Sequence, residues 1–405
     1  MEIMKKLALS SVAVAVALVV QSAAAKVALD PQSIDLEPFL FVPTLEVETK
    51  HDSNIYAQPS GKEVDSMVVT VSPTFRLMAQ DRENNYHVQY AIAAGIYSED
   101  SNDNYVDHKL DVGAHFEPTS RVRFNVGAGY AMLHDDRGTG ASEGKGLAAI
   151  KAMSEPDQYK KTGLHGGVQY GAEDAAGQLY FNLGMSQKRY DDSTIAVSRD
   201  LDNLNASLGL HLRLMPKTKL LLDIERDEGS YESAATAATS DYEETRLLVG
   251  VAWESTAKTS GKVRIGDSKR DLPGRSLSKF TWDLGVQWAP VERSRFSFNG
   301  GQRASEGTLP TIAIETTNYS LAWNHDWSER LESRVSVGLT NEDHERQAGT
   351  GSRSDDTTVL SANLNYQMRR WLVIGGGVSN RERDSSQPGF AFDRNVISLN
   401  ALISL

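Results

Sequence analysis

Hydrophobic and polar residues alternate over most of this chain, in runs of about ten residues. The last run, 394–405 (RNVISLNALISL), shows the pattern clearly, because its odd-numbered positions from 397 onward are all apolar. Ser398, Asn400 and Ser404 occupy the positions between them. Since successive side chains of a strand point to opposite faces, this run predicts a strand with one apolar and one mostly polar face.

Similar runs follow one another through the chain and are joined by two kinds of connection. Short turns (DREN, EPTS, EDAAGQ, MPKT, STAKT, PVERS, WSER and MRR) alternate with longer loops rich in Asp, Ser, Asn and Gly. Strands connected in this way form an antiparallel meander. Counting the runs predicts about eighteen strands, an even number, so both chain ends lie on the side of the short turns.

Two architectures bury such strands: a soluble β-sandwich and a barrel whose outer face contacts lipid. A single soluble domain rarely contains this many long strands, so the pattern favours the barrel. We therefore predict an all-β fold, a transmembrane antiparallel up-and-down β-barrel with both termini in the periplasm. Aromatic residues expected near strand ends agree with the girdles of such barrels; they are Tyr130, Tyr170, Trp253, Trp282, Trp288, Trp323, Trp327 and Trp371.

The amino end has the pattern of a secretory signal peptide. Lys5 and Lys6 precede an apolar run over 7–20, and small residues at 23–25 form a cleavage site. We predict that residues 1–25 are removed, although an uncleaved anchor is the alternative. Residues 26–39 are then a periplasmic lead-in and residues 40–405 the barrel, which places the protein in the outer membrane of a Gram-negative bacterium.

Composition adds two constraints. The chain contains no cysteine, so disulfides do not stabilise it in the oxidising compartment to which it is exported. Its net charge of −12 is spread along the chain, which argues against binding to nucleic acid.

The polar faces of the predicted strands carry amides, hydroxyls and charges of both signs. Amides and hydroxyls exchange hydrogen bonds with sugar hydroxyls, and Arg guides carboxylates or phosphates, so these faces predict a path for a hydrophilic polymer. The simpler alternative is that every wide barrel lines its water with polar groups. The candidates for the path are Arg76, Arg123, Arg213, Arg264, Gln287, Arg295, Asn299, Arg334, Asn363 and Asn365.

No catalytic motif stands out, since G-x-S-x-G, H-E-x-x-H and a phosphate-binding glycine loop are all missing from the sequence. His134 beside Asp135 and Asp136, and His344 within 343–345, are histidines flanked by carboxylates in acidic surroundings, which are more often solvated side chains than catalytic groups. We predict no catalytic residue, metal or cofactor.

Three loops deserve separate interpretation. The acidic loops at 100–107 and 191–192 lack the ordered ligand spacing of a specific calcium site. The longest break, 135–158, contains LAAIKAM, which predicts one or two helical turns. We expect this loop to lie outside the cell and to fold over the mouth or inward as a constriction.

The opening FVPTLEVETKHDSNIY carries a family resemblance. Pro43 begins a strand that is followed by a polar segment over 51–56 (HDSNIY), and with the hairpin series and the chain length this resembles the β-barrel porin family associated with exopolysaccharide and capsule biosynthesis loci. The last strand resembles the signal read by the barrel-insertion machinery, although it ends in Leu405 and not in an aromatic residue. The family implies an outer-membrane pore that helps an extracellular polysaccharide leave the cell.

We therefore predict a pore that exports an exopolysaccharide or capsular polysaccharide. The alternatives are a general or sugar-selective diffusion porin, an outer-membrane enzyme acting on lipid or glycan, and a scaffold with a plugged lumen. The expected partners are outer-membrane lipid and lipopolysaccharide, the polysaccharide, the barrel-insertion machinery and periplasmic export components.

Overall fold

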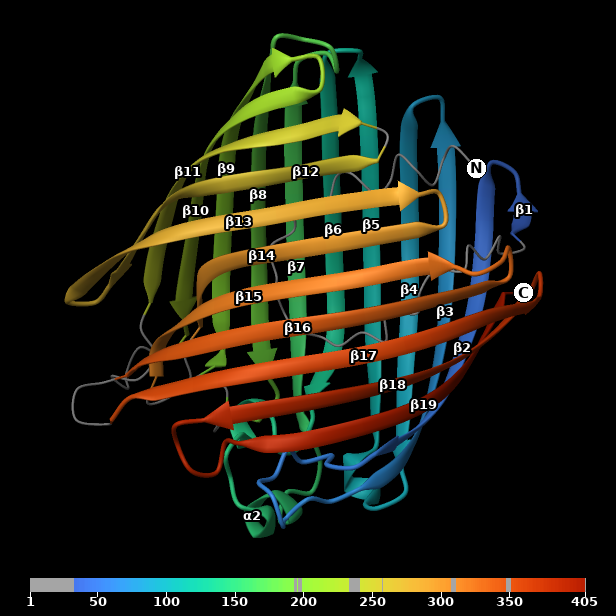
Figure 1. Ribbon diagram of the computed structural model, residues 1–405, viewed down its shortest axis with the longest axis vertical. Coiled ribbons are helices and arrows are strands. Elements are labelled where there is room, and N and C mark those ends of the chain that lie inside the picture. Colours follow the sequence, from blue (N-terminus) through green and yellow to red (C-terminus); the bar gives the residue numbers. More distant parts are fainter. Residues whose placement is uncertain are drawn as a thin grey trace.

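The computed structural model of the protein describes residues 33–192, 195, 199–232, 241–256, 258–306, 311–346 and 351–404. In this part of the chain, antiparallel strands form one sheet, and β2 to β19 close into a barrel of eighteen strands because β19 pairs with β2 (Figure 1). The remaining strand, β1 (Ile34–Leu36), pairs with the start of β2. The predicted fold class and strand number are confirmed.

The barrel strands follow each other in chain order around the ring, and each pairs with its neighbours in sequence. They are β2 (Phe39–Asp52), β3 (Ser66–Asp81), β4 (Asn84–Tyr97), β5 (Tyr105–Thr119), β6 (Val122–Asp135), β7 (Asp157–Tyr170), β8 (Gly177–Tyr190), β9 (Leu201–Met215), β10 (Thr218–Tyr231), β11 (Tyr242–Thr256), β12 (Thr259–Leu272), β13 (Arg275–Val291), β14 (Ser294–Glu306), β15 (Thr311–Asp326), β16 (Leu331–Arg346), β17 (Arg353–Arg369), β18 (Leu372–Ser385) and β19 (Phe392–Ser404).

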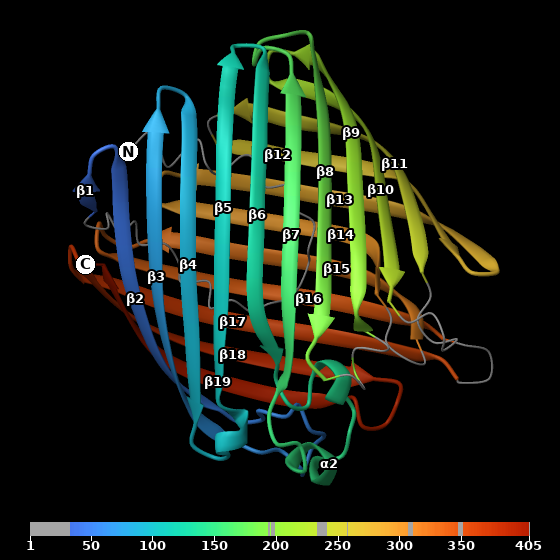
Figure 2. The same cartoon turned by 180° about the vertical axis from the view of Figure 1, so that it is seen from behind.

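Alternation along each strand separates an apolar outer face from a polar inner face. Val335, Leu364 and Leu399, for example, are 44%, 50% and 63% exposed, although they are large and apolar. An apolar surface repeated on every strand suits lipid and not water. In Figures 1 and 2 the strands of the near wall run across those of the far wall, as strand tilt in a closed barrel requires. Among the described residues, no helix is long and apolar enough to cross a bilayer.

The connections sort into two ends, and this prediction is confirmed with one exception. Every turn predicted to be short joins strands at one end of the barrel. The end of β19 and the start of β2 lie at the same end. The opposite end carries the longer loops, including the one that contains α2 (Leu147–Lys151), the helical turn expected there. The exception at that end is the two-residue connection between β12 and β13, Pro273 and Gly274, where Gly274 takes a left-handed φ of +78° that permits a tight turn.

The chain termini also bear on the sequence predictions. The last strand closes the barrel as expected, and the Arg394 side chain on β19 donates from Nε to both carboxylate oxygens of Asp52 on β2, at 3.0 and 2.9 Å. The segment predicted to be a periplasmic lead-in, 26–39, contains β1, and the first barrel strand begins at Phe39, one residue before the predicted start of the barrel. The predicted signal peptide and its cleavage site lie outside the described residues.

Aromatic side chains gather at the short-turn end on β13 to β15. Trp288 lies 5.3 Å from Phe296 between ring centroids, and Phe296 lies 6.2 Å from Trp323. Such rings suit the bilayer interface, where an apolar body meets water. Two of the aromatics expected at strand ends, Tyr130 and Trp282, lie well inside their strands.

Candidate functional site

A row of polar residues crosses the inner face of the barrel from β14 to β2. Directly paired residues of adjacent strands lie on the same face, and the positions that alternate with this row carry the exposed apolar side chains. The row therefore faces the lumen, and we call it the amide belt. Its members are Arg295, Asn324, Arg334, Asn363, Gly377, Ser398 and Lys50.

Glycines on β18 let the neighbouring amides lie flat against the wall. A Cβ atom on Gly377 would come within 2.3 Å of the Asn363 Oδ1 atom, and one on Gly375 would come equally close to Asn365 and Asn400. A larger residue at either position would therefore push these amides into the lumen. The glycines keep the passage wide beside a wall of hydrogen-bonding groups.

A second cluster lies on β9 to β13 and is dominated by ion pairs. Arg264 on β12 contacts Asp223 at 2.9 Å and Glu225 at 2.8 Å, both on β10, and Asp283 on β13 at 2.8 Å. Its side chain crosses β11 at Gly250, where a Cβ atom would lie 2.6 Å from the Arg264 Cγ atom. We call the cluster of Asp223, Glu225, Arg264 and Asp283 the ion wall.

All ten predicted path residues occupy strand positions that face the lumen, but their surroundings differ. Arg295, Arg334 and Asn363 share the amide belt, and Asn365 is the adjacent inward residue on β17. Arg264 is the centre of the ion wall. Arg76 on β3, Gln287 on β13 and Asn299 on β14 lie in strand interiors, outside the amide belt and the ion wall.

Arg123 and Arg213 have a different environment, at the turn between β7 and β8. The Arg123 guanidinium lies 3.7 Å from the Glu173 carboxylate, and Arg213 donates to the Glu173 carbonyl oxygen at 2.8 Å. Both side chains therefore fasten a turn at the short-turn end. Their predicted contact with a transported molecule stays a prediction.

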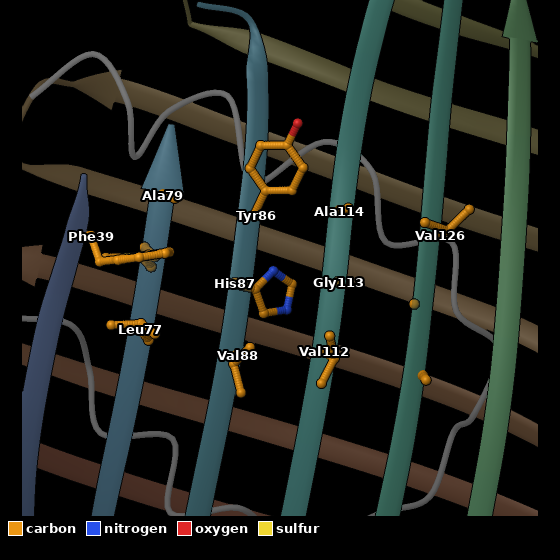
Figure 3. Close-up of a pocket in the computed structure, with 13 residues that line it drawn as sticks. Phe39, Leu77, Ala79, Tyr86, His87, Val88, Val112, Gly113, Ala114 and Val126 are labelled. Atoms are coloured by element: carbon orange, nitrogen blue, oxygen red, sulfur yellow. The ribbon is translucent and has the colours of Figure 1, made fainter. Parts of the chain in front are cut away.

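The wall formed by β4 to β7 has an inward row in which two glycines stand between two histidines. His87, Gly113, Gly127 and His165 form one inward row, and each imidazole lies over the glycine beside it. Figure 3 shows the His87 ring against β5 at Gly113, with the apolar side chains of this region around it. The His87 Nε2 atom is 2.7 Å from Asp111, so the ring is fixed by a carboxylate of the same wall.

Three loops at the long-loop end pack together, and we call them the cap: residues 53–65, 98–104 and 136–156. Their small apolar core consists of Ile55, Tyr56 and Ile150, which are at most 3% exposed. Gly138 approaches the Tyr56 carbonyl so closely that a Cβ atom would lie 2.3 Å from its oxygen. The cap is therefore a packed structure and not a set of independent loops.

Arg137 is the centre of the cap and is 1% exposed. Its guanidinium donates to Asp103 at 2.6 Å, to Asp100 at 2.6 Å and to the Tyr56 hydroxyl at 2.9 Å, which joins all three loops. Burial raises the pKa of the Tyr56 hydroxyl well above its usual value, and its hydrogen bond to Asp103 raises it further. The hydrogen bond from Arg137 lowers the pKa of the Asp100 carboxyl.

The 136–156 loop is also anchored on the far side of the ring. Glu143 pairs with Arg353 on β17 at 3.4 Å and with Arg383 on β18. Five strands (β5, β4, β3, β2 and β19) separate β6, where this loop begins, from β18. The loop therefore crosses the mouth along a chord, as predicted.

The two histidines considered as catalytic candidates are held by structural contacts. His134 lies between Asp107 at 2.8 Å and Asp136 at 3.1 Å, and its ring stacks on Tyr105 with 3.9 Å between centroids. His344 lies 3.4 Å from Asp355. His344 also lines a cavity of about 370 Å³ between the ends of β13 and β14.

One group has the composition of a cation site. Ligand atoms of Glu342, His344 and Asp355 lie within 4.8 Å of one another. The Arg353 guanidinium donates to both oxygens of Asp355, at 3.1 and 2.9 Å from Nε, so a cation would have to displace it. In the acidic loops, Asp100 pairs with Arg137 and Asp191 pairs with Lys160 at 2.8 Å, which leaves these carboxylates with cationic partners from the protein.

The cap should loosen in acid. The pKa of the Asp100 carboxyl is lower in the folded cap than in the unfolded chain, where it is about 3.9. The ionised carboxylate therefore stabilises the cap fully above that unfolded value, and this stabilisation is lost as the pH falls through the lower folded pKa. We expect conductance in planar bilayers to rise as the pH falls below about 3.9, and Asp100→Asn to reduce that rise. Equal conductance of the wild-type protein at pH 7 and pH 3 would contradict this role of Asp100.

Sequence reasoning selected Arg264, Arg295, Arg334 and Asn363 as separate polar residues, but it missed the residues that build the cap and did not predict the two clusters. Arg137 and Glu143 are single charges in a glycine-rich loop, and nothing in their spacing indicates partners on other loops and strands. Asn324 and Lys50 belong to the amide belt because of strand register, which alternation alone does not fix across six strand pairs. The alternation did place all of these strand residues on the polar face.

Comparisons with known proteins agree with this architecture. The ferric enterobactin receptor PfeA from Pseudomonas aeruginosa, solved as a mutant in complex with enterobactin, is similar with a TM-score of 0.50 and 10% identity, over 89% of this chain and 81% of that chain. OccK2 (OpdF) from Pseudomonas aeruginosa has a TM-score of 0.49 and 12% identity, over 90% and 98% of the two chains. At 10% identity the similarity to PfeA concerns the fold alone.

Comparison with curated protein sequences finds no match. The sequence family described as "Putative beta-barrel porin 2" matches residues 28–404, which is nearly the whole chain. The resemblance inferred from the opening segment and the hairpin series is confirmed. The chain therefore belongs to this family of porin-like outer-membrane β-barrels.

Proposed function

We propose that this barrel is an outer-membrane pore that exports an exopolysaccharide or capsular polysaccharide. The observation that carries the proposal is the amide belt, a row of amides, a hydroxyl and cations that crosses the lumen wall from β14 to β2 and is interrupted at Gly377. Sugar hydroxyls donate and accept hydrogen bonds, so a row of such groups offers a moving chain successive partners of similar strength. Arg295 and Arg334 add sites for carboxylated or phosphorylated sugars.

The flattened amides over Gly375 and Gly377 support a polymer as the cargo. A chain needs a passage that stays wide along its length, and the glycines keep side chains close to the wall. In this role the partners are the polysaccharide, outer-membrane lipid and lipopolysaccharide, the barrel-insertion machinery and periplasmic export components. A signal peptide over residues 1–25 directs the chain to that membrane.

A sugar-selective diffusion porin is the second candidate, and the 136–156 loop is the observation that favours it. A loop that crosses the mouth and is anchored at Glu143 narrows the path in the way a size-limiting constriction does. Such a pore would pass small sugars and exclude a polymer. Exporter and diffusion porin are therefore distinguished by the length of the oligosaccharide that passes.

A triple variant tests the belt. Replacing Arg295, Arg334 and Asn363 by alanine removes several hydrogen-bonding groups, each of which contributes about 0.5–1.5 kcal/mol, so the oligosaccharide concentration that half-blocks the conductance should rise roughly tenfold. The matched control replaces Asn182 and Asn205, lumen amides on β8 and β9 outside the belt. Equal block of the triple variant, the control and the wild-type protein would count against a sugar path along the belt.

A further inference from the structure

The wall of the barrel splits between β13 and β14 at the long-loop end. These two strands pair only from Trp282 opposite Gln302 to Val291 opposite Ser294, although β13 begins at Arg275 and β14 extends to Glu306. The unpaired ends stay bonded to their other neighbours, β12 and β15. Two hairpins therefore separate here, and in Figure 1 the joined ends of β12 and β13 project away from β14. We call this opening the split seam.

Side chains bridge the split seam in place of the sheet ladder. The Thr281 hydroxyl donates to the Gln302 carbonyl oxygen at 2.7 Å, just beyond the last paired residues. Farther out, Lys279 pairs with Glu315 on β15, and Arg275 lies 3.1 Å from Glu345 on β16. Both ion pairs are partly exposed, and such pairs contribute little to stability, so the bridge across the seam is weak.

A cavity of about 370 Å³ occupies the split seam and is lined from both faces of the sheet. Arg270, His344 and Arg353 belong to the inward parity of their strands, whereas Phe280, Glu315 and Glu345 belong to the outward parity. Because alternate residues of a strand point to opposite faces, a cavity lined by both sets passes through the wall.

The cavity lies just beyond the apolar band of the barrel. Trp282 and Tyr319, with 5.6 Å between ring centroids, mark the edge of the apolar outer face on this side. The next outward residue of β15 after Thr317 is Glu315, and its paired neighbour on β16 is Asp343. The opening therefore faces the headgroup layer on the side of the long loops.

The cap begins on the far side of the ring from the split seam, and its Glu143 reaches across the mouth to Arg353, which also lines the cavity. The cap rises from the connections of β2 to β7, and the seam between β13 and β14 is nine strands from the connection between β4 and β5. The charges differ across the opening. Lys279 and Arg303 occupy inward positions of their strands, together with Arg270, which pairs with Glu244 at 3.2 Å, whereas Glu315, Asp343 and Glu345 occupy outward positions.

We propose that the split seam is a side exit for an acidic glycan, an inference that rests on the proposed function in polysaccharide export. Cations on the lumen side attract the carboxylates or phosphates of the chain, and carboxylates on the outer side favour its release into the medium. The cap crosses the axial route and narrows it, and the weakly bridged seam opens beside the headgroups.

Cross-linking the seam is the direct test. Because the sequence contains no native cysteine, the cross-linker reacts only with the introduced pair. The protein carrying Lys279→Cys and Glu315→Cys is treated with a short bismaleimide in liposomes loaded with a fluorescent acidic oligosaccharide. We expect the cross-link to reduce oligosaccharide efflux to that of protein-free liposomes. The control pair, Thr245→Cys and Lys269→Cys, is directly opposed across the sealed seam between β11 and β12 and should leave efflux unchanged.

The outcomes separate the two proposals. Efflux that persists after complete cross-linking overturns the side exit and leaves the export function standing. No efflux from the untreated wild-type protein, in a folded barrel, overturns the export function and the side exit together. Lipopolysaccharide in the outer leaflet supplies anionic headgroups with the same chemistry, and if its addition alone abolishes efflux, the opening is a headgroup site and the side exit is wrong.

A second variant widens the seam without a cross-linker. Arg275→Ala removes the outer bridging ion pair with Glu345 and keeps Lys279 on the lumen side, and efflux should rise by roughly threefold or more, since exposed ion pairs bias an opening only modestly. A neutral oligosaccharide of the same length should leave more slowly than the acidic one through the wild-type protein. Unchanged efflux of the variant, or equal rates for the two sugars, would contradict the proposal.

Discussion

Replacing Arg137 by alanine is expected to open the mouth of the barrel while leaving its wall intact. The substitution removes a side chain that bonds both of the other cap loops, and it leaves Asp103, which is 5% exposed, buried without its cation. Removing one partner of a buried ion pair costs about 3 kcal/mol or more. The 136–156 loop should therefore become sensitive to protease, and the open probability in planar bilayers should rise.

Two controls define the result for Arg137. Arg137→Lys keeps the charge but loses the planar fork, so it should give an intermediate effect. Arg121→Ala changes an exposed turn at the opposite end and should leave the cap closed. A protease-resistant cap and wild-type conductance in Arg137→Ala would show that the apolar core of Ile55, Tyr56 and Ile150 holds the loops without this hub.

Replacing Arg264 by alanine is expected to weaken the barrel and change its ion selectivity. Asp223, Glu225 and Asp283 would lose the guanidinium that they share, and Arg264 is itself only 6% exposed. We expect the free energy of unfolding to fall by about 3 kcal/mol. The uncompensated carboxylates should attract cations into the lumen, which a reversal potential measured across a salt gradient would detect as greater cation preference.

Arg295→Ala is the matched control, because Arg295 is an exposed lumen arginine in the amide belt and not in the ion wall. Its loss should change the free energy of unfolding by about 0.5 kcal/mol or less. If Arg264→Ala and Arg295→Ala have the same free energy of unfolding and the same reversal potential, the ion wall contributes neither to the stability of the barrel nor to its ion selectivity.

The repeating features of the fold could be predicted from the sequence because they depend on short-range alternation. Each apolar face must meet lipid and each polar face water, so the strand number, the closing strand and the short turns follow from a period of two. The connection at Pro273 and Gly274 broke the expected alternation of short and long connections, because a glycine with positive φ allows a tight turn at the long-loop end.

The clusters could not be predicted because they depend on register and on contacts distant in sequence. Glu143 meets Arg383 across 240 residues, and no local pattern in a loop specifies that partner. Asn363 and Arg295 were selected as separate polar residues, and only the pairing of β14 to β17 brings them into one row. The split seam is a failure of pairing within strands whose alternation continues, so the sequence pattern gives no sign of it.

The most direct test of the account is planar-bilayer conductance of the refolded protein, with and without an acidic oligosaccharide. A polar lumen lined by the amide belt predicts steady conductance that falls when the oligosaccharide is added, and a smaller fall with a neutral oligosaccharide of equal length. Conductance that does not respond to either sugar, in a demonstrably folded barrel, would contradict the proposal that this pore carries a polysaccharide.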